Sequence, residues 1–415
     1  MRAAARPLVY FPFLTFLIFI LSFLAFISHY YTTSVTDPTS LFFDPIRGHE
    51  RHYSLQRQNE AELYLGNLNL SALSDSRETV PRMCIGIPTV ARDGEQYIRT
   101  TIASLLAGLT PTERREIFLV VLIAHTFPHS HPIFHETWLE TAVDKVLFYN
   151  VSQHQTNTLT VWEKQKEFAK KGIFDYVYTL RHCLATGAQW ITLVEDDTLA
   201  ADGWYFHAVQ ALEEAEDRHT ADPRPDWLYL RLFFTEEFLG WNIEELPKYL
   251  VSSFSIMLIA AVSIILIRQC TLSRYLTNSL ILTITLIYVP ALITLYFAAG
   301  RLTVQPLVAG LREMPKYGCC AQGLVFPREM ATRVATYLEN MGEGFVDELL
   351  EAWANEEGFV RWATCQVSCS TSADIAAKAM ISAPKPSGDR ALRRRYGALV
   401  LRSCGIQRGW GRNTK

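Results

Sequence analysis

Three consecutive carboxylates, Glu195, Asp196 and Asp197, directly follow the apolar run WITLV from Trp190 to Val194. Such a run is typical of a buried strand, and α/β sheets bind their ligands beyond the carboxyl ends of parallel strands. Carboxylate oxygens suit Mg²⁺ or Mn²⁺, and such a cation would hold a diphosphate and offset the charge on a leaving nucleoside diphosphate. The same acids could instead mark an ordinary helix amino terminus, where the macrodipole favours negative charge. The membrane segments described below favour the metal site.

A second pair of acids, Asp347 and Glu348, stands in the sequence GFVDELLEAW. A carboxylate at the start of a helix, after a glycine-containing turn, could take a proton from an acceptor hydroxyl in an inverting transfer. Helix capping and solvated charge are the alternative. We predict Asp347 as the catalytic base, with Glu348 as the second choice.

The segments around these acids alternate apolar runs with amphipathic stretches. We expect strands at 84–90, 117–124, 145–150, 190–194, 227–234 and 319–326, and helices at 54–65, 95–107, 163–186 and 328–341. This alternation predicts an α/β fold with a parallel sheet of nucleotide-binding character. No strand or helix is expected after about residue 365.

Three runs carry no charge: Pro7 to Ser28, Tyr249 to Ile267 and Tyr275 to Ala299. Each is long enough to cross a bilayer core of roughly 30 Å as a helix, and such length without charge argues against buried core helices. The first run is too long for the apolar part of a signal peptide and lacks a clear cleavage site, so we expect an uncleaved anchor. The other two runs form a hairpin.

Basic residues set the expected orientation of these spans. Arg2 and Arg6 precede the first run, and two arginines with no acid lie in RQCTLSR between the other two. The positive-inside rule therefore places the amino terminus and the hairpin tip in the cytosol, and the bulk of the chain in the lumen. The expected parts are a cytosolic tip and anchor at 1–31, a lumenal stem at 32–80, a split catalytic domain at 81–248 and 300–364, the hairpin at 249–299 and an irregular tail at 365–415.

Composition excludes one class of partner and allows disulfides. The 415 residues carry a formal charge of -3, so no basic excess exists for nucleic acid. Asn69 and Asn150 begin N-glycosylation sequons, which a lumenal chain could use. Among the eight cysteines, the neighbours Cys319 and Cys320 could each bond elsewhere, with Cys84 and Cys183 as candidate partners and the connectivity left open. Cys365 and Cys369 lack the second pair that a zinc site needs.

Four stretches carry a specific resemblance: CIGIPTVARDGEQYI from Cys84, WITLVEDDTLAADGWY from Trp190, LYLRLFFTEEFLGW from Leu228 and CCAQGLVFPREMA from Cys319. The chain resembles the Golgi glycosyltransferases that add an N-acetylgalactosamine branch to glycosylphosphatidylinositol (GPI) anchors. That family has a GT-A-type domain split by a transmembrane hairpin after an amino-terminal anchor. The resemblance implies transfer of a sugar from a UDP-sugar to the GPI glycan, with Mn²⁺ or Mg²⁺ as cofactor, in a multi-pass Golgi membrane protein.

The resemblance also implies roles for individual residues. Asp197 would bind the metal, with Glu195 as a second ligand. The donor-binding residues would be Thr89, Val90, Arg92, Asp93, Glu195 and Asp196. The acceptor-binding residues would be Arg231, Phe233, Glu236 and Trp241.

The carboxyl-terminal part departs from the family pattern. Members carry a histidine soon after the helix of the Asp347 type, and such a histidine often completes a metal site, whereas no histidine follows His219 here. The site would then use another ligand, or the end of the sequence is altered. Two other functions remain open from the sequence: a transferase for other glycans, and a non-catalytic membrane scaffold with a degenerate transferase fold.

Overall fold

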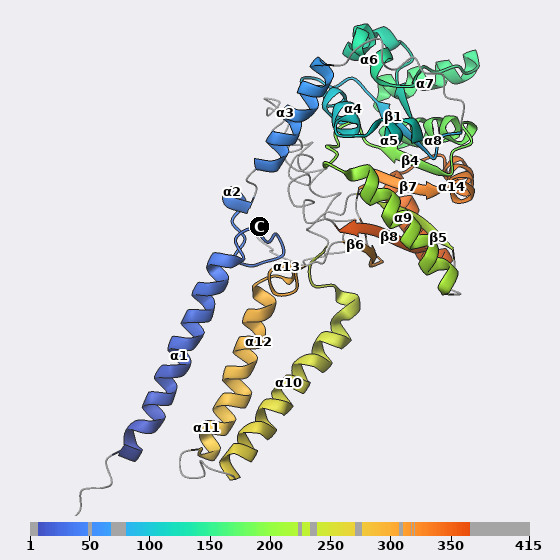
Figure 1. Cartoon of the computed structure of the whole chain (residues 1–415). Coiled ribbons are helices and arrows are strands. Elements are labelled where there is room, and N and C mark those ends of the chain that lie inside the picture. Colours follow the sequence, from blue (N-terminus) through green and yellow to red (C-terminus); the bar gives the residue numbers. More distant parts are fainter. Residues whose placement is uncertain are drawn as a thin grey trace, which may run out of the picture. The chain divides into compact units, whose positions relative to one another are not determined.

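A computed structural model describes residues 7–48, 52–67, 80–222, 226–232, 239–269, 276–306, 310–316, 318 and 320–365 of the chain. These residues belong to the first of two compact units, Met1–Ala376. Asn69, Phe233, Glu236 and the tail after 365 lie outside the described residues. The first unit contains one mixed sheet with helices on both of its faces, together with three apolar helices (Figure 1).

The sheet has eight strands in the order β3-β2-β1-β4-β7-β5-β8-β6. Their bounds are β1 Met83–Thr89, β2 Ile117–Ile123, β3 Lys145–Leu147, β4 Trp190–Val194, β5 Trp227–Arg231, β6 Gly310–Glu313, β7 Gly323–Pro327 and β8 Val360–Cys365. Strands β3, β2, β1 and β4 run parallel. Strand β7 is antiparallel to both of its neighbours, β4 and β5. The expected α/β class is thus confirmed, but the sheet is mixed and not wholly parallel: β5 and β8 also pair in parallel, whereas β7 and β6 run antiparallel to their neighbours.

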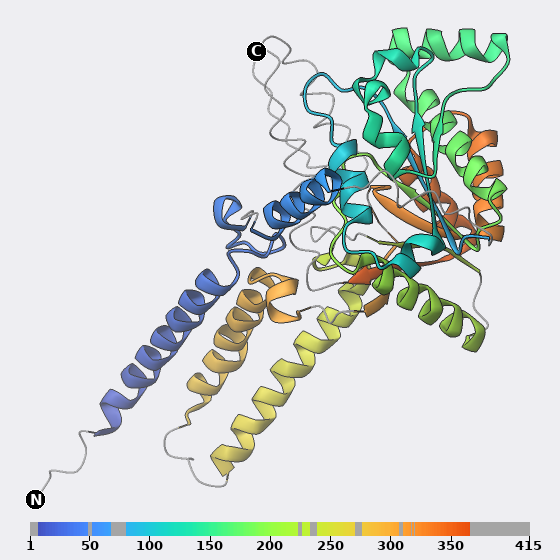
Figure 2. The same cartoon turned by 45° about the horizontal axis from the view of Figure 1, so that its top comes forward.

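Helices cover both faces of the sheet (Figure 2). Each face has its own apolar core. One core packs against α3 His52–Gly66, α4 Ile98–Leu106, α6 Thr137–Ala142 and α9 Trp204–Ala221. The other packs against α8 Phe168–Ala185, α14 Arg328–Met341 and α15 Val346–Glu357. Strands β2 and β4 are buried along nearly their whole length, which explains their uninterrupted apolar sequences.

Three helices are long and apolar enough to cross a membrane: Leu14–Thr33, Ile243–Ile267 and Asn278–Ala298. The first belongs to α1 Pro7–Thr33, and the second contains α10 Leu246–Ile267. The third consists of α11 Asn278–Thr283, a π-helical turn Ile284–Tyr288 and α12 Val289–Ala298. These spans confirm the anchor and the hairpin.

The hairpin interrupts the sheet without separating its halves. Strand β5 precedes α10 and β7 follows α12, yet the two strands pair directly, with Arg231 opposite Leu324. The domain that carries the sheet is therefore continuous in space across the hairpin.

Several hydrogen bonds join the segment after α1 to the end of the hairpin. The Leu41 amide donates to the Ala298 carbonyl oxygen over 2.9 Å, and the Arg301 amide donates to Thr39 Oγ1 over 2.9 Å. The Asp37 carboxylate is buried and accepts from the Thr303 amide over 2.8 Å. The carboxyl-terminal ends of the first and third spans are thus held together by polar contacts.

Helix α3, which falls within the expected stem, packs into the domain. Ala61 and Leu65 are buried in the core on the α4 face. Arg57 is also buried, and its guanidinium donates to the carbonyl oxygens of Ala200, Ser104 and Ala107 over 2.9, 2.9 and 2.7 Å. This helix is therefore part of the folded unit and reaches the loop that follows the acidic motif.

Two further expectations are corrected. The expected helix at 163–186 is two helices, α7 Gln153–Gln165 and α8, because Lys166 takes a left-handed conformation with φ 58° that ends α7. Cys84 and Cys183 bond to each other, so neither can pair with Cys319 or Cys320. The bond joins β1 to α8, two elements that pack face to face.

The remaining described helices are short connections. They are α2 Pro45–Gly48, α5 Pro111–Glu116 and α13 Arg301–Val304, with 3₁₀ turns at Pro128–Ser130, Pro132–His135 and Ile243–Glu245.

Candidate active site

The acidic motif leaves the sheet at the carboxyl end of β4, and backbone contacts hold it on both sides. The Glu195 amide and Thr198 Oγ1 both donate to the Gln322 carbonyl oxygen, over 3.1 and 3.2 Å. On the other side, Thr101 Oγ1 of α4 donates to the Asp196 carbonyl oxygen over 2.8 Å. The motif is thus clamped between the start of α4 and the loop that precedes β7.

Arg92, in the loop after β1, faces two of the three acids. Its guanidinium is bonded to Asp196 and lies 3.2 Å from Asp197 Oδ2. Burial would lower the pKa of Arg92, but the two carboxylates outweigh it and raise the pKa. This contact brings together Arg92, after β1, and Asp196, after β4, which are both expected donor-binding residues.

Thr89 and His131 form a buried chain to Asp196. Thr89 Oγ1 donates to Asp196 Oδ2 over 2.6 Å, and His131 Nε2 lies 3.2 Å from the same hydroxyl oxygen. His131 Nδ1 accepts from the Ile133 amide, so in the neutral ring Nε2 carries the proton and donates to Thr89. Burial lowers the pKa of His131 to about 4, which keeps the ring neutral at neutral pH.

His125, at the end of β2, supports the same loop from another side. Its Nε2 accepts from the Ala91 amide over 2.8 Å, and its ring lies edge-on to His131 with the centroids 5.8 Å apart. Burial also lowers the pKa of His125. Two neutral histidines therefore hold the backbone from Thr89 to Ala91.

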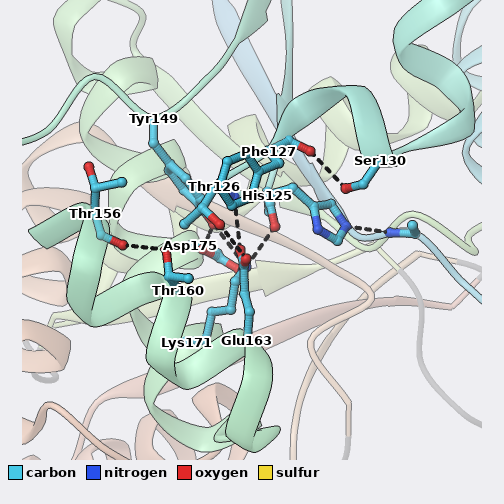
Figure 3. A network of polar contacts seen from close by, with 12 residues as sticks. His125, Thr126, Phe127, Ser130, Tyr149, Thr156, Thr160, Glu163, Lys171 and Asp175 are labelled. Atoms are coloured by element: carbon cyan, nitrogen blue, oxygen red, sulfur yellow. Dashed lines mark hydrogen bonds and ion pairs between the residues drawn. The ribbon is translucent and has the colours of Figure 1, made fainter.

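A polar cluster beside His125 fixes the end of β2 (Figure 3). Lys171 Nζ on α8 donates to the Ala124 carbonyl oxygen, the Tyr149 hydroxyl and Asp175 Oδ2 over 2.7, 2.9 and 2.8 Å. Glu163 accepts from the amide and the hydroxyl of Thr126 over 2.9 and 2.5 Å. These bonds hold the backbone on both sides of His125 in place.

The pKa of Glu195 is strongly raised. Glu195 is exposed to solvent, yet many protein atoms surround its carboxyl group. This crowding raises the pKa of Glu195 to about 8, with further increases from the negative charges of Asp197, Asp347 and Asp196. Burial also raises the pKa of Asp197, although Arg92 opposes that shift. The site therefore concentrates more negative charge than its nearby cation offsets.

Asp347, far along the chain, lies beside this acidic cluster. It stands in the first turn of α15, and its Oδ2 accepts from the Cys320 amide over 3.0 Å. The backbone of the neighbouring Ala321 lowers the pKa of Glu195, in opposition to the crowding. Burial raises the pKa of Tyr176, and both Glu195 and Asp347 add to that shift, so one phenol lies near both acids. Glu348 is exposed.

The residues fit a divalent cation of the kind expected from the sequence. No group of three or more His, Cys, Asp or Glu side chains within the described ranges is arranged to hold a metal by itself. Mg²⁺-type ions, however, are commonly bound by one or two carboxylates, with water and substrate phosphates as the other ligands. The neighbouring carboxyl groups of Glu195 and Asp197, whose pKa values are both raised, match that requirement.

The expected donor residues Val90 and Asp93 lie in the same loop as Arg92, and both are exposed. They are accessible to a ligand over the acidic cluster. Thr89, by contrast, is buried beneath the loop and acts on Asp196.

Two of the expected acceptor residues make contacts within the protein. Arg231 is buried, and its guanidinium lies 3.1 Å from Glu351 Oε1. Trp241 lies at the base of the hairpin, where its Nε1 donates to the Phe297 carbonyl oxygen over 2.9 Å and its ring contacts Tyr249 and Tyr296. Phe233 and Glu236 lie outside the described residues.

The Asn150 sequon is exposed. Ser152 caps α7 through a bond from the Gln155 amide to its hydroxyl. The other sequon, at Asn69, lies outside the described part of the chain.

Sequence reasoning missed the two histidines that hold the donor loop, and it missed the loop from Cys320 to Gln322. The stretch HTFPHSHPIFH, with its four histidines, was the available signal for the histidines. The contacts of the Cys320 loop are made by backbone atoms, which leave no mark in the sequence.

Comparison with known proteins finds similarity to glycosyltransferases. A family model described as GPI-N-acetylgalactosamine transferase PGAP4 matches residues 83–364, from β1 to β8. The chain is also similar to Alpha-1,3-mannosyl-glycoprotein 4-beta-N-acetylglucosaminyltransferase B of Mus musculus, at 25% identity over 185 residues, which is 42% of this chain and 32% of the relative. The Homo sapiens protein of that name is 24% identical over 188 residues, with the same two shares. The chain thus spans about a third of the length of these curated relatives.

Proposed function

We propose that this chain, which belongs to the GPI-N-acetylgalactosamine transferase family, transfers N-acetylgalactosamine or a related hexose or hexosamine from a UDP-sugar to the glycan of a GPI anchor. One observation carries the proposal. The acidic motif at the end of β4 and the acid at the start of α15 are both bonded to one short loop, through Gln322 and Cys320 respectively.

The donor would lie over the loop after β1. Arg92 would bind the diphosphate, and exposed Val90 and Asp93 would contact the base or the ribose. Thr89 and His131 would hold Asp196 in place for the ribose. Because these contacts exist before the ligand binds, little ordering would be needed at that step.

Asp197 and Glu195 would hold Mn²⁺ or Mg²⁺. When bound, the metal supplies a positive charge that stabilises the leaving diphosphate. Its binding requires the deprotonated form of Glu195, whose pKa is about 8 without metal.

Asp347 would act as the base. The acceptor hydroxyl oxygen would form a bond to the anomeric carbon of the donor sugar while the bond from that carbon to the diphosphate breaks. Asp347 would take the hydroxyl proton. Its first-turn position leaves the carboxylate half-exposed and accessible to an acceptor.

The membrane spans suit a lipid-linked acceptor. A GPI glycan lies close to the bilayer surface, and the hairpin is inserted in the chain between β5 and β6 of the sheet that carries the site. We propose a Golgi location, with the amino terminus cytosolic and the catalytic domain lumenal.

The relatives favour a second acceptor class. Their name describes transfer of N-acetylglucosamine to a mannosyl glycoprotein. The alternative function is therefore transfer from UDP-N-acetylglucosamine to a glycoprotein mannose.

The test is UDP release by the purified full-length protein from a panel of UDP-sugars, with Mn²⁺, Mg²⁺ or a chelator, in the presence of GPI glycan or mannosyl glycopeptide. We expect one donor to be used with the GPI glycan, and activity to be lost in Asp197→Asn. The matched control is Asp217→Asn, an exposed acid on α9. Use of UDP-N-acetylglucosamine with the glycopeptide would establish the alternative. No turnover with any donor would contradict both functions.

A further inference from the structure

A buried charged cluster lies beneath the candidate base. Arg231 and Tyr229 of β5, Glu351 of α15 and Arg361 of β8 are all less than a tenth exposed. Arg231 Nη2 lies 3.1 Å from Glu351 Oε1, and Arg361 binds the other oxygen of that carboxylate. The Tyr229 hydroxyl donates to Glu351 as well. Buried charges are tolerated only when they are paired and hydrogen-bonded, so this geometry is strongly constrained.

Glu351 lies one helical turn after Asp347, on the same face of α15. Fixing Glu351 against β5 and β8 therefore fixes the rotation of the helix about its axis. That rotation decides where Asp347 points.

Arg231 also reaches Asp347 by a second route. Its Nη1 donates to the Cys320 carbonyl oxygen, and the Cys320 amide donates to Asp347 Oδ2 over 3.0 Å. Cys320 has φ 72°, a conformation that side-chain-bearing residues rarely adopt. Contacts on both of its peptide groups hold it there.

The same loop contacts Glu195 two residues later. The Gln322 carbonyl oxygen accepts from the Glu195 amide over 3.1 Å. Because consecutive α-carbons are only ~3.8 Å apart, the loop sets the separation between Asp347 and Glu195.

We propose that Arg231 and Glu351 are positioning residues, which hold Asp347 beside the acidic motif through α15 and the Cys320–Gln322 loop. Arg231 then acts on the reaction without touching the acceptor. This inference rests on the proposed function, because it takes Asp347 as the base.

The test compares Arg231→Lys and Glu351→Gln with wild type in the full-length protein. We expect kcat to fall about 10²-fold, the cost of misplacing a reacting group by roughly 1 Å, while KM for the UDP-sugar stays within about threefold. The pH dependence of kcat should shift in both variants, because the surroundings of the base change. Arg181→Met is the matched control, since Arg181 forms an exposed ion pair with Glu339 and should leave kcat unchanged.

Tyr229→Phe is a milder variant, to be used if the charge variants fail to fold. It removes one hydrogen bond to Glu351 and keeps both arginines. We expect a smaller fall in kcat, about tenfold or less, with the same shift in the pH profile. An unchanged kcat with a raised acceptor KM in Arg231→Lys would overturn the proposal and return Arg231 to acceptor binding.

Hydrogen exchange separates this inference from the proposed function. Amides of the 318–326 segment should exchange faster in Arg231→Lys than in wild type, whether or not a donor sugar has been found. Unchanged protection there would overturn the inference alone. Absence of turnover by wild type with every donor would instead contradict the proposed function.

Discussion

The Asp196 carboxylate is bound by both Thr89 and Arg92, whereas Asp197 has Arg92 as its nearby cation. Arg92 thus stands in the position where a metal and a diphosphate would meet. A cation that binds Asp197 must compete with this guanidinium.

Arg92→Met should therefore have opposite effects on two ligands. Mn²⁺ affinity without nucleotide should rise about tenfold, because the competing ion pair is gone, and UDP affinity in the presence of Mn²⁺ should fall about tenfold, because a diphosphate contact is lost. Calorimetric titration of each ligand measures both effects. Arg99→Met, which removes an exposed pair with Glu62, is the control. A fall in both affinities would show that Arg92 supports the metal site.

His131 makes the fold sensitive to acid. Its folded pKa of about 4 lies below the ordinary 6.5, so the folded state favours the neutral ring and the unfolded chain takes up the proton first as pH falls. The contribution of His131 to the free energy of unfolding is fully present above about pH 6.5. It falls by about 3 kcal/mol as the pH falls towards 4.

Unfolding by denaturant at pH 7 and at pH 4.5 measures this dependence in wild type and in His131→Gln. The variant should lose less stability on acidification. His135→Gln changes an exposed histidine of the same segment and should behave as wild type. If wild type and His131→Gln lose the same free energy of unfolding between pH 7 and pH 4.5, His131 is not the source of the acid sensitivity.

At the scale of elements, α3 supports the donor site from outside the sheet. Arg57 donates to carbonyl oxygens on both sides of the contact between α4 and the loop after the acidic motif. These are Ser104 and Ala107 at the end of α4 and Ala200 in the loop. Replacement leaves these buried oxygens without their donor.

Arg57→Met should lower the free energy of unfolding by about 2–4 kcal/mol and should also weaken donor binding, because the Ala200 segment is released. Thermal unfolding and UDP titration measure the two effects. Glu62→Gln, an exposed change on the same helix, should alter stability by less than about 0.5 kcal/mol. If Arg57→Met unfolds with the same free energy as wild type, α3 does not stabilise the domain through Arg57.

The sequence predicts elements better than it predicts the relations between them. The buried runs at β2 and β4 and the three spans are clear because their composition alone requires burial or lipid. The antiparallel direction of β7 is not predictable in this way, since an apolar pattern carries no direction. The break at Lys166 likewise involves neither glycine nor proline.

The acidic motif was predictable because a strand end precedes it, but its neighbours were not. Asp347 and Cys320 reach Glu195 only through the pairing of β7 with β4 and the packing of α15. Arg231 resembled an acceptor residue in sequence, and only its burial shows that it bonds within the protein.

At the scale of the whole molecule, Trp241 connects the domain to its membrane spans. Its ring lies among Tyr249, Tyr296 and Phe297, an aromatic group typical of the membrane interface. Arg301 adds a bond to the Gly240 carbonyl oxygen over 3.0 Å. The base of the hairpin is thus tied together beside the end of the sheet.

Trp241→Ala should reduce transfer to GPI embedded in liposomes about tenfold, because the hairpin loses its anchor at the interface, and leave transfer to a lipid-free GPI glycan unchanged. Parallel assays with the two acceptors measure the ratio. Phe206→Ala, an exposed aromatic on α9, is the control. Equal loss with both acceptors would indicate that Trp241 contacts the glycan itself.

The central claim is that Asp197 and Asp347 serve one reaction at one site. Transfer of labelled sugar from the UDP-donor to GPI in proteoliposomes tests it directly, with wild type, Asp197→Asn and Asp347→Asn compared at saturating donor. We predict that Asp347→Asn binds UDP and Mn²⁺ as wild type does but transfers about 10²–10⁴-fold more slowly, whereas Asp197→Asn loses both binding and transfer. Transfer at the wild-type rate by either variant would contradict the account.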